Sequence, residues 1–121
     1  MQKKILIVDD SLTARRLLAQ YLQGNTVLEA SNGIEALDIL DQHPTIAFAF
    51  VDINMPWMDG LEFLKKIREK KDHQKLPICI LTTETEDKAL EEAKKLGADA
   101  FVIKPAAKDQ VLSLIKNLAS S

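Results

Sequence analysis

The chain has 121 residues, of which 46% are hydrophobic and 28% are charged, and its formal net charge is −2. This length and composition are those of one ordinary globular domain, and the small negative charge offers no electrostatic attraction for nucleic acid. Near the N-terminus, the apolar run at residues 5–8 is followed by two acids and is too short for a signal-peptide core or a membrane span. Cys79 is the single cysteine and cannot form an internal disulfide, so we expect a buried thiol and a cytoplasmic protein.

Strand-like and helix-like segments alternate five times along the chain. Strands are predicted at residues 5–9, 26–30, 46–52, 77–82 and 100–104, and helices at residues 12–23, 34–42, 61–70, 86–96 and 108–118. Ser11 is placed to cap the first helix, and Gly24 and Gly97 to end the first and fourth helices. A strict alternation of this kind predicts an α/β fold, with a parallel sheet covered by helices on both faces.

Apolar patterns indicate which residues form the core. Residues 46–51 are apolar without interruption and run into Asp52, which is typical of a strand buried on both faces. In two helices, apolar residues at helical spacing predict a core-facing stripe. These residues are Leu12, Leu18 and Leu22 in the first helix, and Val111, Leu112, Ile115 and Leu118 in the fifth.

Polar residues gather where the predicted strands end. The carboxyl ends of parallel strands meet at the edge where open α/β sheets bind their ligands. The residues expected there are Asp9, Asp10, Asp52, Thr82 and Lys104. Each pair of carboxylates repels by about 4 kcal/mol at a separation of about 4 Å and an effective dielectric constant of about 20. Lys104 and a divalent cation are the two candidates for neutralising them.

The available side chains favour a hard cation and phosphoryl chemistry. Oxygen ligands at an open edge favour Mg²⁺ or Mn²⁺ over Zn²⁺. His43 and His73 have no partner at metal-ligand spacing, so both are expected on the solvated surface. A carboxylate, a hard cation, a threonine hydroxyl and a lysine are the groups needed for phosphoryl transfer to an aspartate.

Four motifs, in this order and spacing, resemble the receiver domain of two-component response regulators. They are VDDS at residues 8–11, DINMPWMDG at 52–60, LTTE at 81–84 and IKP at 103–105, and the resemblance covers essentially the whole chain. It implies a flavodoxin-like, doubly wound (βα)5 fold with the strand order 2-1-3-4-5. It also implies a single receiver domain over residues 1–121 without an output domain, which resembles the free-standing CheY-type regulators of chemotaxis.

The resemblance implies the chemistry of the site. Asp52 is the expected phosphoacceptor, and Thr82 and Lys104 are expected to contact the phosphoryl group. The expected ligands of Mg²⁺, with Mn²⁺ as the alternative, are Asp9, Asp10, Asp52 and the backbone carbonyl of Asn54. No other cofactor is implied.

Further residues match positions that control the response. Phe101 matches a switch position that works with Thr82, although a plain core phenylalanine explains it as well. The peptide between Lys104 and Pro105 is expected to be cis. Asn54 and Glu84 match positions that tune dephosphorylation, which we therefore expect to be rapid.

The resemblance also implies partners. A sensor histidine kinase is expected as the phosphodonor, and a protein target on the face formed by the fourth helix, fifth strand and fifth helix. A phosphatase is a further candidate, whereas direct nucleic-acid binding and membrane insertion are not expected, and the protein is expected to be a monomer or a weak dimer. Charged residues expected on the target face are Lys88, Glu92, Lys95 and Lys108. Thr83 and Ala106 depart from the family pattern of a smaller residue and a phenylalanine.

Two other functions stay open. An aspartyl-nucleophile phosphatase carries a second acid two residues after its nucleophile, whereas this chain has Asn54 there. A phosphate sink or a phosphorylation-independent interaction module has the same fold. On the favoured interpretation the protein is not an enzyme with a separate substrate, because it catalyses only its own phosphorylation and dephosphorylation. Arg15 and Arg16 fit either contact with a kinase or simple solvent exposure.

Overall fold

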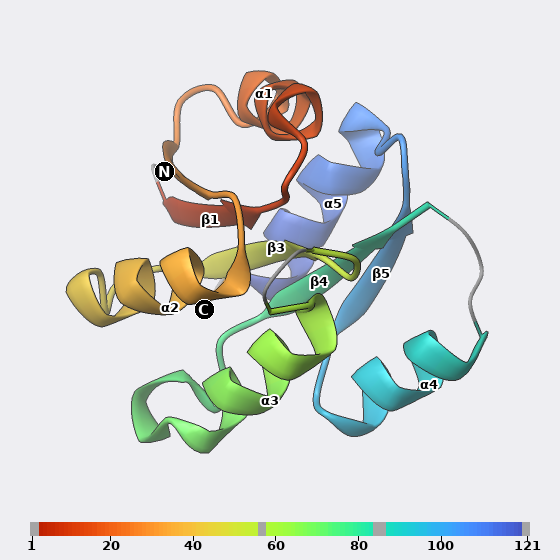
Figure 1. Cartoon of the computed structure of the whole chain (residues 1–121). Helices are drawn as coiled ribbons and strands as arrows, with labels where there is room; N and C mark the ends of the chain where they lie inside the picture. The colour runs from red at the N-terminus through yellow and green to blue at the C-terminus, as the bar shows by residue number, and fades with distance from the viewer. Residues whose placement is uncertain (1–2, 56–57, 84–86, 120–121) are drawn as a thin grey trace.

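The computed structural model describes residues 3–55, 58–83 and 87–119. Its strands form one parallel sheet in the order β2-β1-β3-β4-β5, with α1 and α5 on one face and α2, α3 and α4 on the other (Figure 1). This confirms the predicted flavodoxin-like fold and its strand order.

The elements lie close to their predicted positions. The strands are β1 (Lys4–Val8), β2 (Thr26–Ala30), β3 (Phe48–Asp52), β4 (Ile78–Thr82) and β5 (Ala100–Ile103). The helices are α1 (Leu12–Tyr21), α2 (Gly33–Gln42), α3 (Gly60–Glu69), α4 (Asp87–Lys95) and α5 (Lys108–Leu118), with an unpredicted 3-10 helix, η1 (Lys71–His73), before β4. The predicted start of the fourth helix, Glu86, lies outside the described residues.

Alternate residues of the central strands enter two separate cores. In β1, Leu6 and Val8 pack with α2 and α3, whereas Ile5 and Ile7 pack with α1 and α5. All five residues of β3 are buried, which explains why its sequence is apolar without alternation. Cys79 is buried in the second core, as predicted.

Two leucines predicted in the core are exposed. Leu12 is 51% exposed. It is the first residue of α1, directly after the N-cap Ser11, whereas the buried residue of this helix is Leu18, nearer its end. Leu112 is 39% exposed. It follows the buried Val111, and one residue of an α-helix turns about 100° away from the preceding one.

The predicted exposure of His73 is wrong, since the residue is only 5% exposed. The residue ends η1, a turn that the polar sequence around it did not indicate. Arg68 fixes this turn by donating from Nη1 to the His73 carbonyl at 2.9 Å and from Nη2 to the Gly97 carbonyl at 2.7 Å. His73 therefore lies in the turn that leads into β4, whereas the acidic residues lie at the other end of the sheet, where β4 ends at Thr82.

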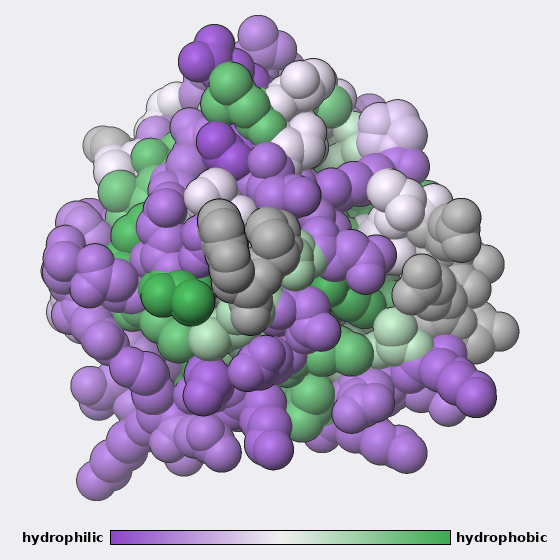
Figure 2. All heavy atoms as spheres, viewed as in Figure 1, coloured by the Kyte–Doolittle hydropathy of each residue, from purple (hydrophilic) through white to green (hydrophobic). Residues whose placement is uncertain are grey.

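The helices are short and amphipathic. The longest helix in the described parts of the chain has 11 residues, and none there has the length and apolarity needed to cross a bilayer. Hydrophilic residues cover most of the face seen in Figure 2, with apolar residues scattered among them.

Gly60 allows α3 to start directly against the end of β3. A Cβ atom at this position would lie 2.5 Å from the Asp52 carbonyl oxygen and 2.8 Å from the Ile53 Cα. Both obstacles are backbone atoms of the segment that carries Asp52. The absence of a side chain at Gly60 thus helps to set the position of that acid.

Gly60→Ala is expected to lower the free energy of unfolding by about 2 kcal/mol, the usual cost of overpacking. Gly33→Ala is the matched control, because Gly33 also opens a helix but its added Cβ would meet the side chain of Met58, at 2.8 Å from Sδ. A movable side chain relieves the clash more easily than backbone, so the loss should be smaller. Urea unfolding measures both variants, and equal losses would contradict this explanation.

Candidate functional site

The acidic residues meet at the carboxyl edge of the sheet. Asp9 and Asp10 follow β1, and Asp52 is the last residue of β3. One carboxylate oxygen from each of the three acids lies within 4.8 Å of the other two. The predicted convergence of residues that are distant in sequence is confirmed.

Asp9 is fully buried at the centre of this edge. Its Oδ1 accepts a hydrogen bond from the backbone N–H of Ser11 at 2.9 Å, and its own N–H donates to the Ala30 carbonyl at 3.0 Å. Its Oδ2 lies 2.6 Å from the Lys104 ammonium but makes no hydrogen bond within the described part of the chain. The contact is an ion pair without a well-aligned hydrogen bond, and it leaves a buried oxygen with unused accepting capacity.

Lys104 forms ion pairs with both buried acids, Asp9 and Asp52. Its Nζ also lies 3.5 Å from Asp52 Oδ2, and its side chain is 18% exposed. The peptide between Lys104 and Pro105 is cis, as expected. When all three acids are ionised, this lysine supplies one positive charge against three negative charges, so the lysine alone does not neutralise the cluster.

Asp52 shows the effect of this imbalance. The pKa of its carboxyl is raised from 3.8 to about 7, first by burial and then by the neighbouring Asp9 carboxylate. Lys104 and the backbone N–H of Asn54, which donates to Asp52 Oδ1 at 3.4 Å, lower the pKa. Asp10 adds a smaller increase. The ionised form of Asp52 is therefore disfavoured until another positive charge arrives.

The site fits a divalent cation. Its three carboxylates offer only oxygen donors, which suit a hard ion. The buried Asp9 Oδ2 lacks a hydrogen bond, and a cation would satisfy it while offsetting the repulsion among the acids. Asp9, Asp10 and Asp52 are the residues able to hold the ion.

The remaining predicted residues surround the acids. Thr82 is buried at the end of β4, and its carbonyl accepts from the Lys104 N–H at 2.7 Å. The side chain of Asn54 is exposed, whereas Phe101 is half-buried against the core beneath α4. Glu84 lies outside the described residues. The roles assigned to these residues stay predictions.

Thr83 and Ala106, the two residues that depart from the family pattern, border one hollow beside the acids. Thr83 is exposed and Ala106 is buried, and both line a hollow of about 380 Å³ against α1. The hollow also reaches Lys104 and Pro105. The small side chain of Ala106 therefore leaves open space next to the predicted phosphoacceptor site.

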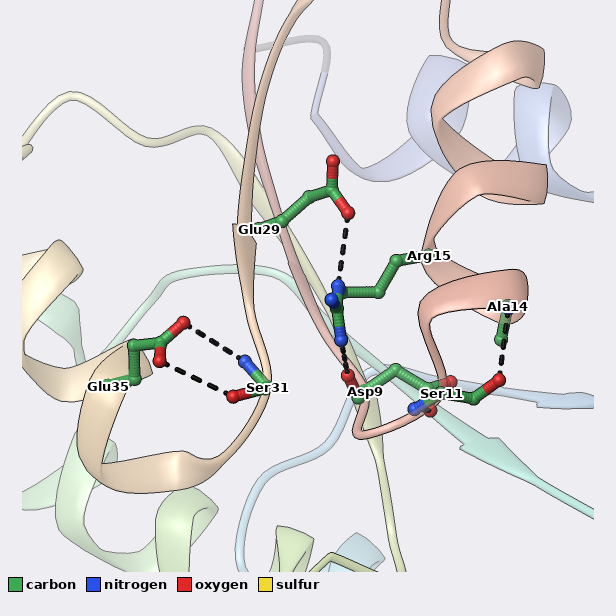
Figure 3. Close-up of polar contacts among 7 residues, drawn as sticks. All are labelled: Asp9, Ser11, Ala14, Arg15, Glu29, Ser31 and Glu35. Atoms are coloured by element: carbon green, nitrogen blue, oxygen red, sulfur yellow. Dashed lines mark hydrogen bonds and ion pairs between the residues drawn. The ribbon is translucent and has the colours of Figure 1, made fainter.

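Arg15 contacts the site in a way that the sequence did not indicate. Its Nη1 donates to the Asp9 carbonyl at 2.6 Å, and its Nε donates to Glu29 Oε1 at 3.0 Å (Figure 3). Its side chain is only 15% exposed, so solvent exposure does not explain it. A positive charge near the N-terminus of a helix is unfavourable because it opposes the helix dipole. The position of Arg15 early in α1 was therefore the available sequence signal that this residue has a special role.

The chain is similar in sequence and in structure to known receiver domains. The family model described as "Response regulator receiver domain" matches residues 5–116. The chain is 39% identical over 105 residues to the chemotaxis protein CheY homolog of Campylobacter jejuni, covering 84% of this chain and 81% of that protein. It is 37% identical to the transcriptional regulatory protein SrrA of Staphylococcus aureus, covering 98% of this chain and 48% of that protein. The structure of Vibrio cholerae CheY4 superposes with a TM-score of 0.90 at 33% identity, covering 98% of this chain and 99% of that one.

Removing the Asp52 carboxylate is expected to stabilise the metal-free protein at high pH more than at low pH. Because the pKa is higher in the folded state, the unfolded chain loses this proton first, and wild-type stability falls as the pH rises from 3.8 to about 7. The advantage of Asp52→Asn over wild type should thus grow by on the order of 2–4 kcal/mol between about pH 4 and about pH 8. Urea unfolding in EDTA measures it; an advantage independent of pH would contradict the raised pKa.

Proposed function

Because the chain belongs to the response regulator receiver domain family of two-component signalling, we propose that Asp52 accepts a phosphoryl group from a sensor histidine kinase in a Mg²⁺-dependent reaction. The observation that carries this proposal is the meeting of three carboxylates with Lys104 at one edge of the sheet. The protein catalyses its own phosphorylation and dephosphorylation and turns over no separate substrate.

Mg²⁺ supplies charge neutralisation for the acids and for the incoming phosphoryl oxygens when it is bound. Its ligands are Asp9, Asp10, Asp52 and the backbone carbonyl of Asn54. The donor set accepts Mn²⁺ by the same chemistry. Asp9 is held by Ser11 and by the backbone of β2, so part of the site is in place before any ligand arrives.

In the transfer step, an oxygen of Asp52 attacks phosphorus. The new oxygen–phosphorus bond forms as the phosphorus–nitrogen bond of the kinase phosphohistidine breaks, and the imidazole leaves with the bonding electrons and takes up a proton from solvent. Lys104, already 3.5 Å from Asp52 Oδ2, pairs with the phosphoryl oxygens. Thr82 directs its hydroxyl to the same group from the end of β4.

The added charge then changes the surface. A phosphoryl group brings about −1.5 to −2 charge units, which draws Thr82 toward Asp52 and frees space for Phe101. Phe101 lines a hollow with Leu90 and Lys94 of α4, so its movement alters the face formed by α4, β5 and α5. Ile103 and Leu112 are exposed on β5 and α5, and they give this face the apolar contacts that a protein target needs.

Two alternatives are separated by experiment. An aspartyl-nucleophile phosphatase needs an acid at the position of Asn54, and this amide cannot protonate a leaving group. A phosphate sink accepts the phosphoryl group but does not change its partners. Unchanged affinity for chemotaxis-type targets after beryllofluoride treatment would favour the sink.

Acetyl phosphate with Mg²⁺ is expected to add one phosphoryl group to the wild-type protein. Asp52→Asn should abolish the addition because it removes the nucleophile. Asp38→Asn, which changes an exposed acid on α2, is the matched control and should be phosphorylated normally. Intact-protein mass spectrometry measures the outcome, and modification of Asp52→Asn at the wild-type rate would contradict the proposal.

The phosphorylated protein is expected to lose its phosphoryl group within minutes in Mg²⁺ without a phosphatase. The reason is that Asn54 and Glu84 carry polar groups able to orient the attacking water. Quenched samples followed by mass spectrometry give the lifetime. A lifetime of many hours would overturn this assignment of the two residues.

A further inference from the structure

Arg15 links three elements around the acidic edge. Its guanidinium reaches from α1 to the Asp9 carbonyl at the end of β1 and to the Glu29 carboxylate on β2 (Figure 3). Glu29 is 38% exposed and Arg15 only 15%. A pair that remains this accessible adds little stability by itself, so its main effect is to fix the direction of the guanidinium fork.

The atom that Arg15 holds lies between two of the acids. The carbonyl of Asp9 and the N–H of Asp10 belong to one planar peptide unit. Fixing the Asp9 oxygen therefore fixes the plane from which the Asp10 side chain departs. Asp10 is exposed, and within the described residues no hydrogen bond or ion pair to its carboxylate is present. The direction of that carboxylate thus depends on the backbone alone.

Each polar atom of Asp9 contacts another residue, through a hydrogen bond or, for Oδ2, through the ion pair alone. Its N–H is bonded to Ala30, its Oδ1 to the Ser11 N–H, and its Oδ2 is paired with Lys104. Its carbonyl is held by Arg15 alone among the described residues. Loss of Arg15 would release this one group and allow the plane before Asp10 to rotate.

We propose that Arg15 is a positioning residue for the divalent-cation site, which holds the peptide between Asp9 and Asp10 so that both carboxylates face the ion. This inference rests on the proposed Mg²⁺ site. The positioning role of Arg15 differs from a general electrostatic role, because a positive charge near the acids would by itself repel the cation. Replacement of Arg15 by an uncharged residue therefore distinguishes the two roles: loss of a positioning residue lowers the affinity for Mg²⁺, whereas loss of a repelling charge raises it.

The test is the Mg²⁺ dissociation constant of Arg15→Gln, measured by isothermal titration calorimetry on folded protein. We expect weaker binding by about tenfold, the lower end of the loss seen when residues that orient metal ligands are removed. Arg16→Gln is the matched control: it removes the same charge from the next, exposed position of α1 and should bind Mg²⁺ as tightly as wild type or slightly more tightly. Equal or tighter binding by Arg15→Gln would overturn the proposal.

Arg15→Lys provides a second measurement that keeps the charge. A lysine ammonium lacks the fork that serves Glu29 and the Asp9 carbonyl together, so its dissociation constant should lie between wild type and Arg15→Gln. If Arg15→Gln does not fold, this variant decides alone, and wild-type affinity would count against the proposal. Failure of wild-type protein to bind Mg²⁺ would instead refute the proposed function, whereas binding that is insensitive to Arg15 refutes only this inference.

Discussion

Three carboxylates repel one another at a single edge of the sheet, and the surrounding structure has to hold them there. The sheet brings Asp9, Asp10 and Asp52 together, and within the described part of the chain Lys104 is their one direct positive partner. Burial prevents water from screening this charge, and the raised pKa of Asp52 records the cost. In the proposed function, a divalent cation would neutralise the acids, and a phosphoryl group would pair with the lysine.

The fold makes such an arrangement tolerable. β1 and β3 lie in the middle of the sheet and are covered on both faces by the two cores, so their ends are firmly placed. Gly60 lets α3 approach the Asp52 backbone, and Ser11 and Arg15 hold the turn after β1. Burial of apolar side chains elsewhere thus stabilises an edge that is itself unfavourable, as is common for functional sites.

The sequence allowed the fold and most of the site to be predicted because both follow from periodic patterns. The apolar run before Asp52 identified a buried strand, and parallel strands necessarily end at one edge, so Asp9, Asp52 and Lys104 could be placed together. Arg15 could not be assigned in this way, since its partners come from two other elements. The predictions for His73 and Leu12 were wrong for local reasons: His73 is buried in an unpredicted 3-10 turn, and Leu12 is the exposed first residue of its helix.

If the site is a cation site, a divalent cation relieves the charge imbalance at this edge and so stabilises the folded protein. The most direct measurement is the free energy of unfolding of wild-type protein as Mg²⁺ increases at constant ionic strength, with Asp10→Asn in parallel. Wild-type stability should rise with the logarithm of the Mg²⁺ concentration once the site begins to fill, and Asp10→Asn should lose most of this rise. A wild-type response to Mg²⁺ no greater than the response to sodium would contradict it.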